Sequence, residues 1–239
     1  MKNIKAVLFD LDGTLLPMEQ AKFMKAYFGR LSKRMAERGY DPTAFIGALW
    51  EGTKAMVKND GSASNECVFW NKFSEILGDK ILEEQVTLDE FYETDFELVR
   101  ESCGFDPTAA PAVRKLREAG YKTVLATNPL FPSVATRARM RWAGLTEEDF
   151  EFFTAYENSR FTKPNLDYYR EIAARLGVSL DQCLMVGNDV GEDMIAEELG
   201  MKVFLTDKCL INNVGKDASD YPRGTFDELC SLLLSDSPW

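Results

Sequence analysis

Nearly continuous apolar runs mark four segments of the chain as buried strands. They occupy residues 4–9, 121–126, 183–186 and 201–205. These runs lack the strict apolar–polar alternation of a strand with one face in water. Strands that are covered by helices on both faces have this character, and such strands are usually parallel. The runs therefore predict the strands of a parallel sheet.

Apolar residues at helical spacing occur between and after these runs. We expect helices over residues 112–119, 165–176, 192–199 and 225–234. Three of these segments are followed by Gly120, Gly177 and Gly200, and glycine commonly ends a helix. Alternation of strands and helices predicts an α/β fold, with a doubly wound and mainly parallel sheet.

The gap between the first two predicted strands is far too long for a single crossover. Residues 18–104 contain no convincing strand and have the pattern of several helices, with Gly-Ser-Ala-Ser at 61–64 as a loop tip. We therefore assign residues 1–16 and 105–239 to an α/β core. Residues 17–104 form a helical domain that is inserted into it.

The first and last helical segments of this insert carry opposite charge. Residues 19–38 contain six Lys or Arg against two Glu, whereas residues 82–101 contain eight Asp or Glu against one Arg. Two solvated faces are the simpler interpretation, and we expect them. The alternative is that the two segments pair with each other.

Composition and charge narrow the classes of function. The net charge of −11 argues against nucleic acid or an anionic membrane as a partner. No apolar stretch approaches the roughly 20 residues that a membrane span needs, and no leader pattern opens the chain. The five cysteines are scattered and form no CxxC pair, as expected for reduced thiols. Together these features predict a cytoplasmic protein.

Histidine is absent from the chain. This excludes His-based acid–base catalysis, the Ser-His-Asp and Cys-His nucleophiles, and almost all zinc sites. Carboxylates, lysine, tyrosine or a hard metal ion must carry the chemistry of any enzyme built on this sequence.

Polar residues gather where the predicted strands end. Asp10 and Asp12 follow the first strand, Thr127 and Asn128 the second, and Asp189 the third, with Asp193 four residues later. Ligands of open α/β sheets bind at the carboxyl ends of the strands. If the chain stays extended after the first strand, Asp10 and Asp12 project to the same side. We therefore expect these side chains to converge on one crevice.

Each of these residues also has an ordinary structural interpretation. Asp-Gly is a common turn, Asp189 suits the start of a helix, and an isolated Lys163 suits the surface. The set as a whole has a chemical logic. Converging carboxylates repel one another, and a bound Mg²⁺ relieves that repulsion. Hydroxyl, amide and ammonium groups, from Thr127, Asn128 and Lys163, suit a phosphoryl group.

The motifs at these positions resemble those of the haloacid dehalogenase (HAD) superfamily. "VLFDLDGT", "TVLATN", "TKPN" and "MVGNDVGED" occur in the order of that family's four motifs. The resemblance covers residues 1–16 and 105–239 and points to the phosphatase-like branch, in which many members carry a helical cap between the first two motifs. It implies a Rossmann-like core and Mg²⁺-dependent hydrolysis of a small phosphorylated metabolite.

The resemblance also implies roles for the acidic residues. Asp10 is expected to attack phosphorus and form an aspartyl-phosphate. Asp12 is expected to protonate the leaving oxygen and then to accept a proton from water. Asp10, the backbone carbonyl of Asp12, and Asp189 are expected to hold Mg²⁺. Asp193 is expected to support the metal site without being a direct ligand, or to orient Lys163.

Three further residues are expected to bind the phosphoryl oxygens. These are Thr127, the backbone of Asn128, and Lys163. Pro129 follows Asn128 where many members of the superfamily have Gly or Lys, and it stiffens the loop. The contact at Asn128 is therefore the least well supported of the three.

Three other activities remain open. Dehalogenation needs neither a metal ion nor an acid for the halide, so Asp12 and Asp189 would have no role in it. A phosphomutase uses the same core, although Thr14 favours hydrolysis over it, because mutases resemble DxDGV at this motif. A non-catalytic phosphate- or metal-binding module has no reason to keep both Asp10 and Asp12.

The substrate depends on the insert, which contains no motif. A closing cap limits the pocket to a small soluble phosphate and predicts poor activity on phosphoproteins and nucleic acids. For side chains of the insert, core packing or solvation is the expected role, although six could instead face the crevice: Lys22, Lys25, Arg30, Lys54, Trp50 and Trp70. Nothing in the sequence indicates the oligomeric state.

Overall fold

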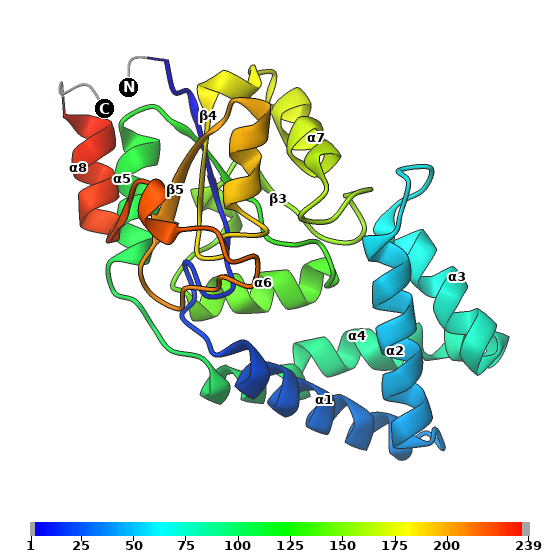
Figure 1. Ribbon diagram of the computed structural model, residues 1–239. Helices are drawn as coiled ribbons and strands as arrows, with labels where there is room; N and C mark the ends of the chain where they lie inside the picture. Colours follow the sequence, from blue (N-terminus) through cyan, green and yellow to red (C-terminus); the bar gives the residue numbers. More distant parts are fainter. Residues whose placement is uncertain (1–2, 236–239) are drawn as a thin grey trace.

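A six-stranded sheet forms the centre of the computed structural model, which describes residues 3–235 (Figure 1). The sheet order is β3-β2-β1-β4-β5-β6, and each neighbouring pair is parallel. This confirms the predicted α/β fold. The strands are β1 (Ala6–Phe9), β2 (Lys122–Leu125), β3 (Phe152–Phe153), β4 (Cys183–Gly187), β5 (Lys202–Thr206) and β6 (Arg223–Gly224).

The four predicted strands are β1, β2, β4 and β5. The sequence prediction missed β3 and β6, because two residues are too few to show a period. Three predicted helices are present as α5 (Ala109–Glu118), α7 (Leu166–Leu176) and α8 (Phe226–Leu234). The fourth is a 3-10 helix, η5 (Met194–Leu199), and α6 (Ser133–Trp142) was not predicted. Short 3-10 turns are η3 (Glu147–Asp149), η4 (Leu180–Gln182) and η6 (Ala218–Asp220).

Both faces of the sheet are buried, which explains the near-continuous apolarity of its strands. Along β1, Val7 and Phe9 point into the core that includes α5, α6 and α8. Ala6 and Leu8 point to the opposite face, where they join residues of α7 and η5. Successive strand residues thus face different helices, and neither set reaches water.

The insert contains four α-helices and two 3-10 helices, and they lie beside the sheet rather than on it (Figure 1). The chain leaves and re-enters the core at one place, where the amide of Gly104 donates to the carbonyl of Pro17 at 2.7 Å. The elements are α1 (Gln20–Ala36), α2 (Pro42–Val57), α3 (Asn65–Leu77), η1 (Asp79–Glu84), α4 (Gln85–Glu93) and η2 (Asp95–Ser102).

The expectation of two separate solvated faces in the insert was wrong. Arg34 lies 3.4 Å from Glu90 and 3.6 Å from Asp95, and Arg38 lies 2.9 Å from Glu84. The first and last helical segments therefore pair. Apolar contact brings them together, because the ring of Tyr27 packs against rings of α4 and η2. The opposite charges then meet at the margin of that contact.

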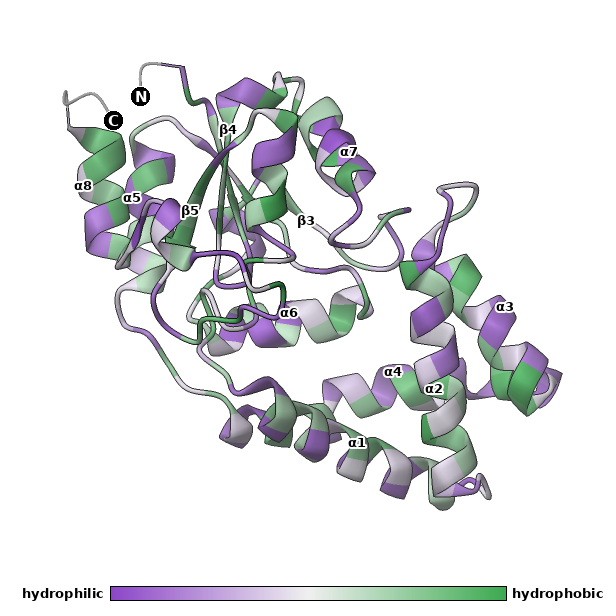
Figure 2. Cartoon of the chain, viewed as in Figure 1, coloured by the Kyte–Doolittle hydropathy of each residue, from purple (hydrophilic) through white to green (hydrophobic). Residues whose placement is uncertain are grey.

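Colouring by hydropathy distinguishes the strands from the helices of the insert (Figure 2). The strands of the sheet are mostly hydrophobic, whereas the helices of the insert alternate hydrophobic and hydrophilic residues along their length. Among the helices of residues 3–235, none combines the length and the apolarity of a membrane span.

Candidate active site

The strand order reverses between β1 and β4, and this point brings together residues that are distant in sequence. A cavity of about 130 Å³ lies at the carboxyl ends of the strands. Six of the seven predicted site residues line it: Asp10, Asp12, Thr127, Asn128, Asp189 and Asp193. The seventh, Lys163, is buried and contacts two of these carboxylates.

The carboxylate of Asp10 is held on both oxygens. Oδ1 accepts a hydrogen bond from the Nζ of Lys163 at 2.8 Å, and Oδ2 accepts one from the hydroxyl of Thr14 at 3.0 Å. The same hydroxyl lies 2.9 Å from Oδ1 of Asn188. Asp10 is only 7% exposed, so these contacts restrict its rotation at the edge of the cavity. The carboxylate is therefore held in one orientation.

Lys163 connects the end of β1 with the segment after β4. Its Nζ lies 2.8 Å from Asp10 and 2.6 Å from Oδ1 of Asp193. Burial alone would lower the pKa of Lys163, but the two carboxylates raise it well above its ordinary value. Lys163 therefore carries a buried positive charge. The other oxygen of Asp193 accepts a hydrogen bond from the amide of Asp189 at 3.0 Å, which fixes the loop that follows β4.

The chain does not stay extended through Asp12. The strand β1 ends at Phe9 and a turn follows from Leu11, yet both aspartates line the cavity. Gly13 makes this turn possible, because its φ of +92° favours glycine. A Cβ at this position would also lie 2.4 Å from the side chain of Asn188.

An arginine that the sequence analysis missed contacts Asp12. Arg139, in α6, is fully buried and donates a hydrogen bond to Oδ2 of Asp12. Its guanidinium carbon lies 4.3 Å from the ring centroid of Phe131, and its Nε donates to the carbonyl of Ala135 at 3.3 Å. Burial raises the pKa of Asp12, and the positive charge of Arg139 opposes that rise. Arg139 thus both orients this carboxyl group and moderates its acidity.

Thr127 and Asn128 follow β2 and hold the neighbouring loops through different groups. The carbonyl of Thr127 accepts hydrogen bonds from the side chains of Thr154, at 2.6 Å, and Tyr168, at 2.9 Å. These contacts anchor the loop while Thr127 lines the cavity. The Asn128 side chain instead bridges loops, since it accepts from the amide of Lys163 and donates to Glu192 at 3.0 Å.

Acidic side chains dominate the charged groups that line the cavity. Five carboxyl groups line it, and no lysine or arginine does. One of them, Glu192, has its pKa raised to about 7 by burial, which the charge of Lys163 partly offsets. Oδ1 of Asp12 is buried and has no hydrogen-bond partner among the described residues. Such a cluster favours a cation.

The donor set fits a hard divalent ion. Asp10, Asp189 and the backbone carbonyl of Asp12 could supply oxygen ligands. Within residues 3–235, no three acidic or thiol side chains form a closed metal cage. Mg²⁺ does not need one, because it commonly binds one or two carboxylates and completes its shell with water and substrate phosphate.

A family model describing haloacid dehalogenase-like hydrolases matches residues 4–197. The chain belongs to this family. A glyceraldehyde 3-phosphate phosphatase from Methanopyrus kandleri is 26% identical over 199 residues, which cover 80% of this chain and 78% of that protein. The HAD assignment therefore agrees with the motifs at the ends of β1, β2 and β4.

Solved HAD structures share the fold. A HAD phosphatase from Thermococcus onnurineus is 21% identical, with a TM-score of 0.60 over 96% of this chain and 98% of that one. An L-2-haloacid dehalogenase from Xanthobacter autotrophicus is 20% identical, with a TM-score of 0.58 over 98% and 100%. Because proteins of both names share this fold, side chains rather than topology must discriminate between the two activities.

Four residues of the site went unassigned in the sequence analysis. Thr14, Asn188 and Glu192 lie inside the first and fourth motifs, so their positions offered a signal. Arg139 offered none. It is one of three arginines at alternate positions in "TRARMR", and only the structure distinguishes this buried residue from exposed Arg137 and Arg141.

Proposed function

We propose that this protein is a Mg²⁺-dependent phosphatase that hydrolyses a small phosphorylated metabolite through an aspartyl-phosphate at Asp10. The observation that carries the proposal is the carboxylate of Asp10, held by Lys163 and Thr14 at the edge of a cavity that Asp12 and Asp189 also line. The name of the Methanopyrus relative supports phosphate monoesters as the substrate class.

The reaction would occur in two displacements. An oxygen of Asp10 attacks phosphorus as the bond to the leaving oxygen breaks, and Asp12 donates a proton to that oxygen. Asp12 then accepts a proton from the water that attacks the phosphoryl group. The bond between phosphorus and Asp10 breaks, and inorganic phosphate is released. Bound Mg²⁺ would neutralise charge between the phosphate and the surrounding carboxylates.

Neighbouring groups would stabilise the transferring phosphoryl group. The hydroxyl of Thr127, the backbone amide of Asn128 and the ammonium of Lys163 are the donors that we assign to its oxygens. Asp193 would act by holding Lys163 and the backbone of Asp189 in place. Arg139 would act by orienting Asp12.

We assign residues 17–104 as a cap over this cavity. Gln20, in the first turn of α1, lines the cavity together with residues of the core. A cap in this position would exclude water and would set the size of the leaving group.

The test is phosphate release from p-nitrophenyl phosphate. Wild-type protein should hydrolyse this ester with Mg²⁺ and lose the activity in excess EDTA, and added Mg²⁺ should restore it. Asp10→Asn should abolish turnover while circular dichroism shows an intact fold. Asp220→Asn, at an exposed position away from the cavity, is the matched control.

Other products would contradict the proposal. Halide release from 2-chloropropionate without Mg²⁺ would indicate dehalogenation. Isomerised sugar phosphate without free phosphate would indicate a mutase. Retained activity in Asp10→Asn would remove Asp10 as the nucleophile.

A further inference from the structure

A second and larger cavity adjoins the candidate active site. Its volume is about 420 Å³, which lies within the range of roughly 300–1,000 Å³ typical of pockets for small organic molecules. Gln20, Leu130 and Phe131 line both cavities. A molecule held at Asp10 would therefore extend past these three residues into the larger space, which we call the aromatic chamber.

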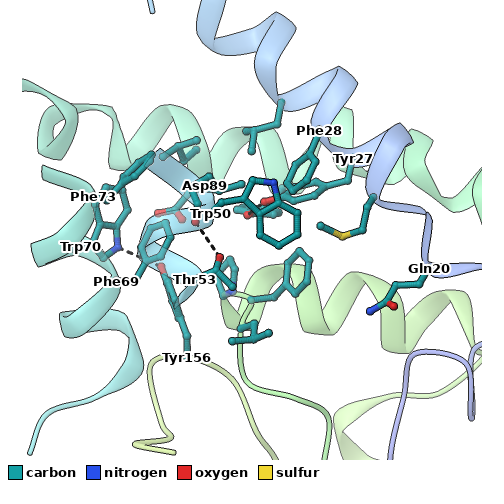
Figure 3. A pocket seen from close by; sticks show the side chains of 18 of the residues that line it. Gln20, Tyr27, Phe28, Trp50, Thr53, Phe69, Trp70, Phe73, Asp89 and Tyr156 are labelled. Atoms are coloured by element: carbon teal, nitrogen blue, oxygen red, sulfur yellow. Dashed lines mark hydrogen bonds between the residues drawn. The ribbon is translucent and has the colours of Figure 1, made fainter. Parts of the chain in front are cut away.

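Aromatic rings dominate the wall of this chamber. Of its nineteen lining residues, nine are aromatic, seven are aliphatic or proline, and three are polar. Figure 3 shows rings from α1, α2 and α3 around one space, with Tyr156 of the core on its border. Trp50 is 44% exposed although it is one of the largest apolar side chains of the insert. Apolar surface of this kind beside a reactive site indicates an apolar ligand.

Most polar groups of the chamber wall already form hydrogen bonds within the protein. The hydroxyls of Tyr27 and Tyr92 lie 2.6 Å apart, and the indole NH of Trp70 donates to Tyr156 at 3.4 Å. The hydroxyl of Thr53 donates to a carbonyl of its own helix at 2.9 Å. The hydroxyls of a triose or sugar phosphate would find few free partners here, and burying them unpaired is unfavourable.

Charge excludes a second anionic group on the ligand. The nineteen lining residues include no lysine or arginine, and Asp89 is the one charged member. The basic residues considered from the sequence, namely Lys22, Lys25, Arg30 and Lys54, do not line the chamber, whereas Trp50 and Trp70 do. Bisphosphates and nucleotides would thus enter an apolar space without a counter-charge.

We propose that the aromatic chamber binds the leaving group of the substrate, and that this group is an uncharged aryl or arylalkyl alcohol. The assignment rests on the phosphatase function proposed above. The phosphoryl group would lie at Asp10, and the aromatic part would pass Phe131 to pack against Trp50 and Phe69. Stacked and edge-to-face contacts with these rings would supply selectivity beyond simple burial.

The test compares two esters with similar leaving oxygens, 2-phenylethyl phosphate and ethyl phosphate. The phenyl ring should raise kcat/KM by at least about tenfold, because it transfers from water into the chamber. Trp50→Ala should reduce this preference about tenfold. Val57→Ala removes an exposed apolar side chain from the same helix outside the chamber, and it should keep the wild-type preference. Equal kcat/KM for the two esters in wild-type protein would overturn the assignment.

A binding measurement distinguishes failure of this assignment from failure of the proposed function. 2-Phenylethanol carries no phosphate, so its binding, followed by NMR titration, does not depend on the chemistry at Asp10. Saturable binding that Trp50→Ala weakens would support the chamber as an aromatic site even if no phosphate monoester were hydrolysed. Absence of binding to wild-type protein would overturn the assignment whatever esters are hydrolysed.

Discussion

The guanidinium of Arg139 donates a hydrogen bond to Asp12, although the two residues stand 127 positions apart in the chain. Arg139 is fully buried and its guanidinium lies over the ring of Phe131. An arginine held on several sides offers its donors in a fixed direction. It therefore determines where the carboxyl group of Asp12 points and compensates its charge.

Replacing Arg139 should impair the proton transfer that we assign to Asp12. We expect Arg139→Met to lower kcat/KM for ethyl phosphate by roughly 10–100-fold, a part of what a general acid contributes. The ratio kcat/KM reports the first displacement, in which Asp12 acts as the acid, and not the later hydrolysis that both esters share. The loss for p-nitrophenyl phosphate should be smaller, because its leaving group departs with little help from an acid. Steady-state kinetics on both esters measure the difference.

Arg137→Met serves as the matched control for this comparison. Arg137 lies in the same helix, but it is exposed and pairs with Glu147. Its replacement should leave both esters at the wild-type rate. An equal loss of kcat/KM on both esters in Arg139→Met would mean that Arg139 has only a structural role.

Lys163 should be essential both for stability and for activity. Removing one partner of a buried ion pair leaves uncompensated charge, so Lys163→Met should lower the free energy of unfolding by about 3–5 kcal/mol. Urea unfolding at pH 7 measures this change. Phosphatase activity should disappear in the same variant, because the position of Asp10 also depends on Lys163.

A double variant separates these two effects. Lys163→Met combined with Asp193→Asn removes one of the two buried carboxylates that lose their partner. The free energy of unfolding should be higher in the double variant than in Lys163→Met, whereas phosphatase activity should remain absent. Additive loss of stability in the double variant would show that Lys163 and Asp193 are not energetically coupled.

The ion pair between Arg38 and Glu84 should make the stability of the insert depend on pH. A hydrogen bond from Arg38 is the main cause that lowers the pKa of Glu84 from its ordinary value of 4.5. A carboxyl group with a lowered folded-state pKa stabilises the fold above its unfolded pKa. That contribution is lost as pH falls through the folded value.

We therefore expect Arg38→Ala to reduce the melting temperature at pH 7 and to reduce it less at pH 4. Thermal unfolding followed by circular dichroism measures both differences. Lys33→Ala, at an exposed position in the last turn of α1, should show a smaller effect that varies less with pH. The same loss at both pH values in Arg38→Ala would contradict the ionic account of this contact.

Apolar patterning predicted the parts of the fold whose burial is continuous. The strands β1, β2, β4 and β5 are long enough to show it, and α7 has both a helical period and Gly177 at its end. Helix α6 was not predicted because its buried face contains the charged residue Arg139 and the polar residue Thr136. The pairing of α1 with α4 and η2 was not predicted, because opposite charge on two segments does not show that their surfaces are in contact.

For the site, sequence could indicate the residues at strand ends, because the fold itself brings those ends together. Asp10 and Asp189 follow neighbouring strands and line the same cavity. The contact of Arg139 with Asp12 could not be predicted, since the burial of Arg139 depends on how α6 packs against the rest of the core. The aromatic chamber could not be predicted either. Its wall combines four helices of the insert with two loops of the core, and no single stretch of sequence contains it.

The proposed reaction requires Asp10 to carry the phosphoryl group between the two displacements. The most direct measurement is rapid acid quench of Asp12→Asn with p-nitrophenyl phosphate and Mg²⁺, followed by mass spectrometry of the peptide that contains Asp10. The good leaving group allows the first displacement without an acid, whereas hydrolysis of the intermediate stalls without the base. If Asp10 is the nucleophile, one phosphoryl group should appear on Asp10 as p-nitrophenol is released. Release of p-nitrophenol together with free phosphate, with Asp10 unmodified at every time point, would contradict it.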